Sequence, residues 1–156
     1  MRQCELCGKE SLELKRVLNF PYRTPMGIVT IEGESTLEEC SFCEEVLVPG
    51  ELINAWNRMI LERLSKLEGF FTPEELQFIF SVLPYSQNEL AQSTGRERST
   101  LTKYKTGANP IDPLFVDALQ AIIVDYLAGN EKTLIRLRKR IEFRFAEEKS
   151  KKSQLS

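Results

Sequence analysis

The chain has 156 residues, of which 42% are apolar and 28% charged, values that are typical of a globular protein. It has no run of 18 apolar residues and no apolar signal core at its start, so we expect a cytoplasmic protein without a membrane span. It also has no histidine, which excludes histidine-based acid–base catalysis and histidine metal ligands.

The net charge of −2 is not that of a non-specific nucleic-acid binder, but it is unevenly distributed. Residues 1–70 carry 8 basic and 12 acidic side chains, and residues 71–129 carry 4 and 7. Residues 130–156 carry 9 basic and 4 acidic side chains. Any affinity for DNA must therefore come from local basic positions and not from the field of the whole chain.

Four cysteines form two C-x-x-C pairs, Cys4 with Cys7 and Cys40 with Cys43. Each pair can present two sulfurs to one ion from a tight turn, and two such turns complete a tetrahedral zinc site. Two disulfides or four unrelated buried thiols are the alternatives, and a reducing cytosol disfavours the disulfides. Four thiolates leave no open position for water, so we predict a structural zinc ion and not a catalytic one.

The segment between the two pairs predicts a small sheet. Leu12 and Leu14 alternate with polar residues, and residues 28–31 form a β-branched run. Over residues 50–67 the apolar period becomes helical, which predicts an amphipathic helix that covers the sheet, with a groove for a partner as the alternative. We therefore expect a zinc-binding subdomain of a small sheet and one helix over residues 1–68.

Residues 72–107 predict three short helices. Thr72 with Glu75 and Ser86 with Glu89 fit the S/T-x-x-E capping box, and Gly95 fits the sharp turn after the second helix. Three helices with a tight turn before the last one form a helix-turn-helix, which places its final helix in the major groove of DNA.

The outward face of that final helix is small, polar and cationic. With Leu101 as the inward residue, a period of about 100° per residue directs Ser99 and Lys103 away from the core. A lysine can donate to a guanine edge and a serine can pair with most bases. An ordinary solvated helix face is the alternative. The complete set of predicted DNA contacts is Gln87, Arg96, Arg98, Ser99, Thr102, Lys103, Lys105 and Thr106.

Asp112 and Pro113 begin a longer helix that Gly129 ends, and this helix is apolar over most of its circumference. A second copy of the chain could cover so much apolar surface, so we predict a homodimer that reads a palindromic site. Residues 69–129 then form the DNA-binding and dimerisation domain.

Residues 130–156 predict a basic amphipathic helix and a polar tail, which could extend the dimer or lie along phosphates. The expected fold class is mainly α, with a small α+β zinc-binding subdomain at the N-terminus.

The combined pattern resembles the MqsA (YgiT-type zinc finger) antitoxins of bacterial type II toxin–antitoxin systems. The resemblance covers about residues 1–128. It rests on the four cysteines with Gly8, on residues 71–76 and 86–91, and on residues 98–107. It implies a lambda-repressor-like (Xre/Cro-type) helical bundle after the zinc subdomain. Ser99 and Lys103 occupy the positions at which the family's base-reading Asn and Arg stand, which implies a different operator.

The resemblance implies an antitoxin that binds operator DNA as a dimer and represses its own operon. It also implies that the zinc subdomain binds a small toxin protein, often a ribonuclease. A stand-alone zinc-finger regulator without a toxin is the alternative, and an adaptor that uses only the zinc subdomain is another. An enzyme is not expected, because the sequence offers neither an open metal position nor a Ser/His/Asp or Cys/His arrangement.

Overall fold

The computed structural model describes residues 2–130 and 135–137. The chain divides into an N-terminal unit, Met1–Ile60, and a helical unit that begins at Leu61. Within the described residues, none of the helices combines the length and the apolar character needed to cross a membrane. The basic helix predicted for residues 130–156 lies outside the described residues, apart from residues 130 and 135–137.

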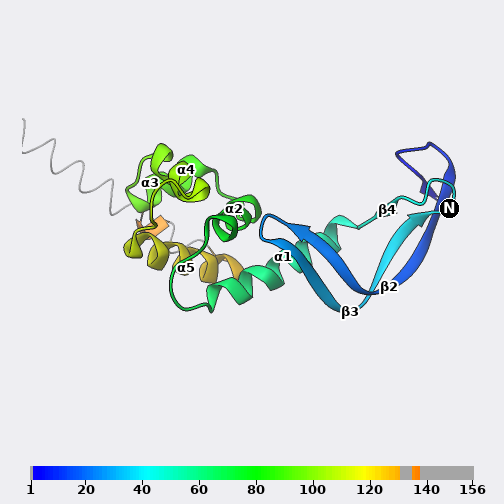
Figure 1. The fold of residues 1–156 in the computed structure, drawn as a ribbon, viewed down its shortest axis with the longest axis horizontal. Coiled ribbons are helices and arrows are strands. Elements are labelled where there is room, and N and C mark those ends of the chain that lie inside the picture. The colour runs from blue at the N-terminus through cyan, green and yellow to red at the C-terminus, as the bar shows by residue number, and fades with distance from the viewer. Residues whose placement is uncertain (1, 131–134, 138–156) are drawn as a thin grey trace, which may run out of the picture. The chain divides into compact units, whose positions relative to one another are not determined.

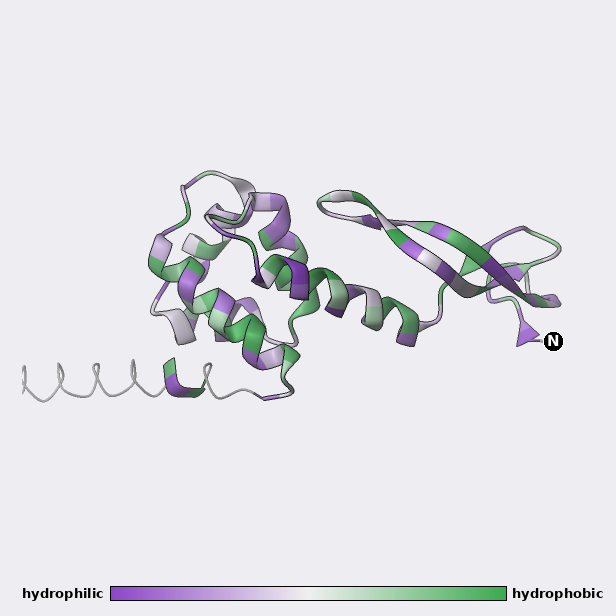
Figure 2. Ribbon diagram, turned by 90° about the horizontal axis from the view of Figure 1, so that it is seen from below, coloured by the Kyte–Doolittle hydropathy of each residue, from purple (hydrophilic) through white to green (hydrophobic). Residues whose placement is uncertain are grey.

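A long antiparallel hairpin dominates the N-terminal unit (Figure 1). It consists of β2 (Glu10–Thr24) and β3 (Gly27–Cys40), and two short strands, β1 (Arg2–Gln3) and β4 (Val46–Leu47), complete a sheet of order β1-β2-β3-β4. The two short strands pair only with the hairpin end that carries Leu12 and Glu38. Figure 2 shows apolar and polar residues alternating along the hairpin, as expected when one face of a sheet is covered.

A bulge at Asn19 changes the period of β2. Asn19 has a positive φ of 51°, the strand register shifts between Leu18 and Phe20, and the Asn19 side chain accepts a hydrogen bond from the Gly33 amide at 3.2 Å. One residue of β2, Asn19, thus lies opposite two residues of β3, Glu32 and Gly33, and Val17 and Phe20 pack against the same apolar cluster although they are three positions apart. A simple period of two therefore does not describe this strand.

Helix α1 (Gly50–Ser65) covers that face of the hairpin within the N-terminal unit. Trp56 of α1 is 4% exposed, and its ring centroid lies 5.2 Å from that of Phe20 and 5.3 Å from that of Tyr22. The Tyr22 hydroxyl donates to the Asn57 side chain at 2.8 Å, so the aromatic ring is buried while its polar end is satisfied.

The prediction of a mainly α protein is wrong, because the N-terminal unit is built on a sheet whose two main strands have 15 and 14 residues. The sequence predicts only parts of these strands, because the irregularity at Asn19 breaks the alternation and Pro21 and Gly33 suggest loops. Pro21 is tolerated because β2 pairs there only with β3, which leaves an edge where a missing N–H costs little. The sheet and the helices together make an α+β protein.

The helical unit contains α2 (Pro73–Val82), α3 (Gln87–Thr94), α4 (Arg98–Thr106) and α5 (Pro113–Leu127). The predicted helix starts are confirmed. Thr72 forms a complete capping box with Glu75, Ser86 accepts from the Glu89 amide, and Asp112 accepts from the Leu114 amide. Gly95 is left-handed, with φ of 67°, and ends α3 as predicted.

The core of this unit is formed by side chains from all four helices. Leu76, Leu90, Leu101 and Leu119 are each fully buried. Helix α5 also buries Phe115, Val116, Ile122 and Ile123 within the chain itself. Most of the apolar surface that the sequence predicts to lie against a second copy is therefore buried within the chain. The large apolar residues of α5 that remain exposed are Leu114 and Val124.

Candidate metal centre and nucleic-acid interface

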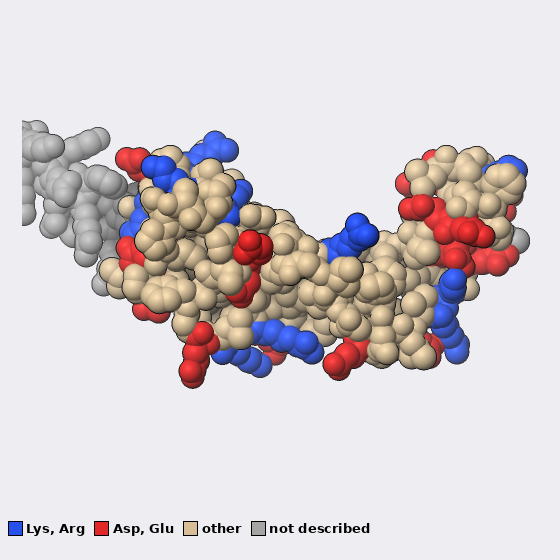
Figure 3. All heavy atoms as spheres, in the orientation of Figure 1, with Lys and Arg blue, Asp and Glu red and all other residues tan. Residues whose placement is uncertain are grey.

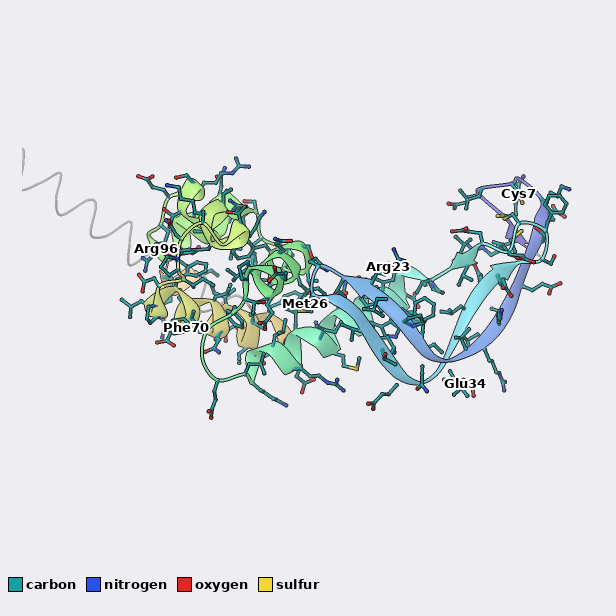
Figure 4. All side chains as sticks on the ribbon, viewed as in Figure 1. Cys7, Arg23, Met26, Glu34, Phe70 and Arg96 are labelled. Carbon is teal, nitrogen blue, oxygen red and sulfur yellow. The ribbon has the colours of Figure 1, made fainter. Side chains whose placement is uncertain are left out.

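The four predicted cysteines come together at one end of the sheet. Their sulfur atoms all lie within 4.8 Å of one another, and Figure 4 shows Cys7 there with neighbouring sulfur atoms. Cys4 and Cys43 lie 3.7 Å apart and Cys7 and Cys40 lie 3.6 Å apart, far longer than a disulfide bond of about 2.05 Å. Sulfurs placed about 2.3 Å from a tetrahedral ion would be about 3.8 Å apart. The donor set and the spacing therefore fit a four-coordinate metal ion.

Each cysteine pair lies in a tight turn, and the two turns have the same hydrogen bonds. In the first turn the Cys4 amide donates to the Lys9 carbonyl and the Gly8 amide donates to the Cys4 carbonyl, both at 2.8 Å. In the second turn the corresponding bonds join Cys40 to Glu45 and Glu44 to Cys40, both at 2.9 Å. The turns are thus closed by the backbone, which leaves the sulfurs available as ligands.

The equivalent positions Gly8 and Glu44 are both left-handed, with φ of 74° and 59°. Glycine adopts this conformation without steric cost, whereas glutamate does so at a cost of about 1–2 kcal/mol. The second turn therefore carries backbone strain that the first turn avoids.

Ser11 is a residue of this site that the sequence analysis missed. Its hydroxyl lies 2.8 Å from Cys40 Sγ, and its carbonyl accepts from the Ser41 amide at 2.9 Å. These contacts join the start of β2 to the second turn. They are buried, because Ser11 is only 8% exposed. A serine within a strand has no motif of its own, and the pairing of Leu12 with Cys40 is what brings Ser11 to the thiol.

The hydrogen bonds around Cys40 favour its thiolate. The Cys43 amide is the largest influence and the Ser11 hydroxyl the next, and together they lower the pKa of Cys40 to about 6. For Cys43 the Glu45 amide favours the thiolate, but the neighbouring Cys40 sulfur and burial outweigh it and raise the pKa to about 12. Part of the opposition between the two shifts comes from the contact between Cys40 and Cys43, because a hydrogen bond between two thiols favours ionisation of one and disfavours ionisation of the other.

The surface around the cysteines is acidic. Figure 3 shows Asp and Glu side chains gathered at this end of the N-terminal unit. Leu6 and Phe42, the apolar residues at the tips of the two turns, are 68% and 61% exposed. The Lys9 ammonium lies 3.1 Å from the centre of the Phe42 ring. The metal site is thus bordered by the exposed apolar side chains of Leu6 and Phe42 and by carboxylates.

In the helical unit, α4 has the orientation expected from its sequence. Leu101 is fully buried and Tyr104 is 5% exposed, while Ser99, Thr102 and Lys103 are exposed on the other side. Arg98 and Thr106 are also exposed, and Lys105 is half-buried. Figure 3 shows Lys and Arg side chains over the region of α3 and α4.

Four of the predicted contact residues form one hydrogen-bond network centred on Gln87. The Gln87 side-chain amide donates to the Arg98 carbonyl at 3.0 Å and to the Thr102 hydroxyl at 2.7 Å, and it accepts from Lys105 Nζ at 3.3 Å. Lys105 and Thr102 are therefore joined to the start of α3 through Gln87. This network holds α4 against α3 and fixes the direction of its exposed face.

Arg96, another of the predicted contact residues, also has partners within the chain. Its guanidinium donates to the Thr94 carbonyl at 3.1 Å and to the Asp112 carboxylate at 2.5 Å. The side chain is 23% exposed. Its geometry is that of a residue that joins the α3–α4 turn to the start of α5.

No protein-family model, curated protein or solved structure matches this chain.

Proposed function

We propose that the protein is a zinc-stabilised DNA-binding repressor of the antitoxin type, which acts as a homodimer on a palindromic operator. The observation that supports it best is the exposed polar face of α4, with Ser99 and Lys103 outward and Leu101 fully buried behind them. A short helix that is anchored on one side and cationic on the other can enter a major groove.

Zinc is the ion that we propose for the four cysteines. Thiolates favour it over harder cations, and a Cys4 set without an open position suits a structural role. The ion would hold the two turns and both short strands at the end of the hairpin. With one dication bound by four thiolates, the site would carry a net charge of −2 on a surface that is already acidic.

The DNA proposal is tested with double-stranded DNA from immediately upstream of the protein's own coding sequence, titrated by fluorescence anisotropy. Lys103→Ala and Ser99→Ala should each weaken binding by about 1–3 kcal/mol, since each removes a base contact. Lys15→Ala, an exposed lysine of β2, is the control and should leave binding unchanged. Arg98→Ala should weaken binding across sequences and lower the salt dependence. Wild-type affinity in both α4 variants would exclude this face as the DNA reader.

The proposed toxin partner would bind the acidic end of the N-terminal unit. Support comes from the exposure of Leu6 and Phe42 and from the carboxylates of Glu5, Glu44 and Glu45, which suit a basic protein with an apolar pocket. The test is co-purification with the product of the adjacent reading frame. Phe42→Ser should weaken a complex that Leu14→Ser, a change at a still more exposed apolar residue of the hairpin, leaves intact. Absence of any complex would favour a repressor that acts without a toxin.

A further inference from the structure

Two adjacent phenylalanines in the segment between α1 and α2 have opposite environments. Phe71 is 4% exposed and belongs to the core of the helical unit, whereas Phe70 is 64% exposed. The backbone on both sides is fixed, because the Leu67 carbonyl accepts from the Gln120 side chain at 3.1 Å and Thr72 caps α2. Phe70 is therefore a large apolar side chain held in solvent by a well-anchored segment (Figure 4).

A surface hollow of about 500 Å³ lies beside Phe70. Its walls come mainly from Phe71, Pro73, Tyr104, Pro110 and Ile111, and none of the described residues that line it is charged. A cavity of about 150 Å³ is enough to hold benzene. The hollow can therefore accept a phenyl ring with room for the groups that carry it.

A second hollow of about 370 Å³ lies on the α5 side of Phe70, between this segment and Pro113, Val116 and Gln120. Leu67, also on its rim, is 50% exposed. The charged residues along it are Glu68 and Asp117. Phe70 and Leu67 thus form an exposed apolar patch with the walls of the two hollows, and aromatic residues in such patches are enriched at protein interfaces.

We propose that this surface joins two copies of the chain, with Phe70 of each protomer inserted into the 500 Å³ hollow of the other. A projection and a matching hollow that lie side by side on one surface are self-complementary under a two-fold axis, so one contact generates the other. Burial of an aromatic anchor in a desolvated pocket is the usual source of binding energy at an interface. A second copy of the chain already carries both the projecting ring and the hollow, so it supplies the complementary surface itself.

This interface differs from the dimer contact that the sequence of α5 suggested. Five apolar residues of α5 are buried within the same chain, namely Phe115, Val116, Leu119, Ile122 and Ile123. Leu114 and Val124 remain exposed, and Asp117 lies between them in the helix. The Phe70 surface offers a larger aromatic anchor and an adjacent place to receive it. The inference rests on the homodimer of the proposed function, since it names the surface that joins the two copies, but it does not depend on DNA or toxin binding.

Sedimentation equilibrium on the full, zinc-loaded chain tests the proposal over about 1–100 µM. The wild type should be a dimer, and Phe70→Ser should raise the dimer dissociation constant by at least about tenfold, since it removes the anchor from both contacts. Phe70→Leu should have a smaller effect. Val124→Ser is the matched control from α5 and should change the constant by less than about twofold. A monomeric wild type, or a Phe70→Ser dimer as tight as wild type, would overturn the proposal.

A mixing experiment tests the insertion itself. Asn109→Trp places a large ring in the hollow but keeps Phe70, whereas Phe70→Ser keeps the hollow but loses the projection. Each variant alone should dimerise weakly, while an equimolar mixture should form a tighter heterodimer, because one of the two contacts is restored. A mixture no tighter than either variant would show that Phe70 does not enter this hollow. Circular dichroism of each variant should match wild type, since both altered side chains are exposed.

Discussion

Arg96 and Asp112 join the turn between α3 and α4 to the start of α5. One carboxylate oxygen of Asp112 accepts from the Arg96 guanidinium at 2.5 Å, and the other accepts from the Leu114 amide at 2.9 Å. The same carboxylate thus caps a helix and holds the segment that precedes α4. Although Arg96 is one of the predicted DNA contacts, its internal contacts give it a structural role that Arg98 does not share.

Arg96→Ala should lower the free energy of unfolding by about 1–2 kcal/mol, because it removes a partly buried charge-assisted bond from a helix cap. Arg98→Ala should change it by less than about 0.5 kcal/mol, since Arg98 is exposed. Asp112→Asn keeps a capping oxygen and should cost less than Asp112→Ala. Urea unfolding of the four variants at fixed zinc measures these differences. Equal stability of the Arg96 and Arg98 variants would contradict the structural role.

Ser11→Ala should weaken zinc binding by about tenfold, because outer hydrogen bonds to metal ligands typically contribute 10- to 100-fold in affinity. The hydroxyl lies 2.8 Å from Cys40 Sγ and stabilises its thiolate, and alanine removes this donor. Competition with a chromophoric chelator gives the affinity. Ser41→Ala is the control, since the Ser41 hydroxyl contacts a carbonyl and not a sulfur. An unchanged affinity in Ser11→Ala would remove Ser11 from the site.

Zinc binding should weaken as the pH falls through the neutral range. The raised pKa of Cys43, about 12, keeps this thiol protonated at pH 6–8 in the metal-free protein, so binding must displace at least that proton. The apparent affinity should then fall at least about tenfold for each unit by which the pH is lowered. Cys40, with a pKa lowered to about 6, adds a further proton only below that pH. Calorimetry in buffers of different ionisation enthalpy counts the protons, and a pH-independent affinity would contradict a thiolate site.

Glu44→Gly should raise the free energy of unfolding by about 0.5–1 kcal/mol. The change relieves the left-handed backbone of the second cysteine turn, and the greater freedom of glycine in the unfolded chain offsets part of the gain. Gly8→Ala, the converse change in the first turn, should destabilise the protein. Glu45→Gly is the control, because Glu45 has an ordinary φ, and it should lower stability slightly. A Glu44→Gly variant less stable than Glu45→Gly would show that the turn is not strained.

The sequence alone determined the features that depend on residues close together in the chain. Thr72, Ser86 and Asp112 each cap a helix within three residues, and Gly95 provides a left-handed turn by its own backbone freedom. The inward position of Leu101 follows from the helical period. The spacing of the cysteines predicted a metal cluster because each pair closes its own turn, and the four sulfurs do come together.

The tertiary structure decided what depends on distant residues. The length of the hairpin follows from the pairing of β2 with β3 across a bulge, and that pairing brings Ser11 to Cys40. Packing between distant parts of the chain also pairs Arg96 with Asp112. It buries Phe71 and leaves Phe70 in solvent. Rules based on neighbouring residues cannot predict whether such a side chain is buried or exposed, because its helix or strand propensity is the same in both cases. Only the packing of the other elements determines which environment it occupies.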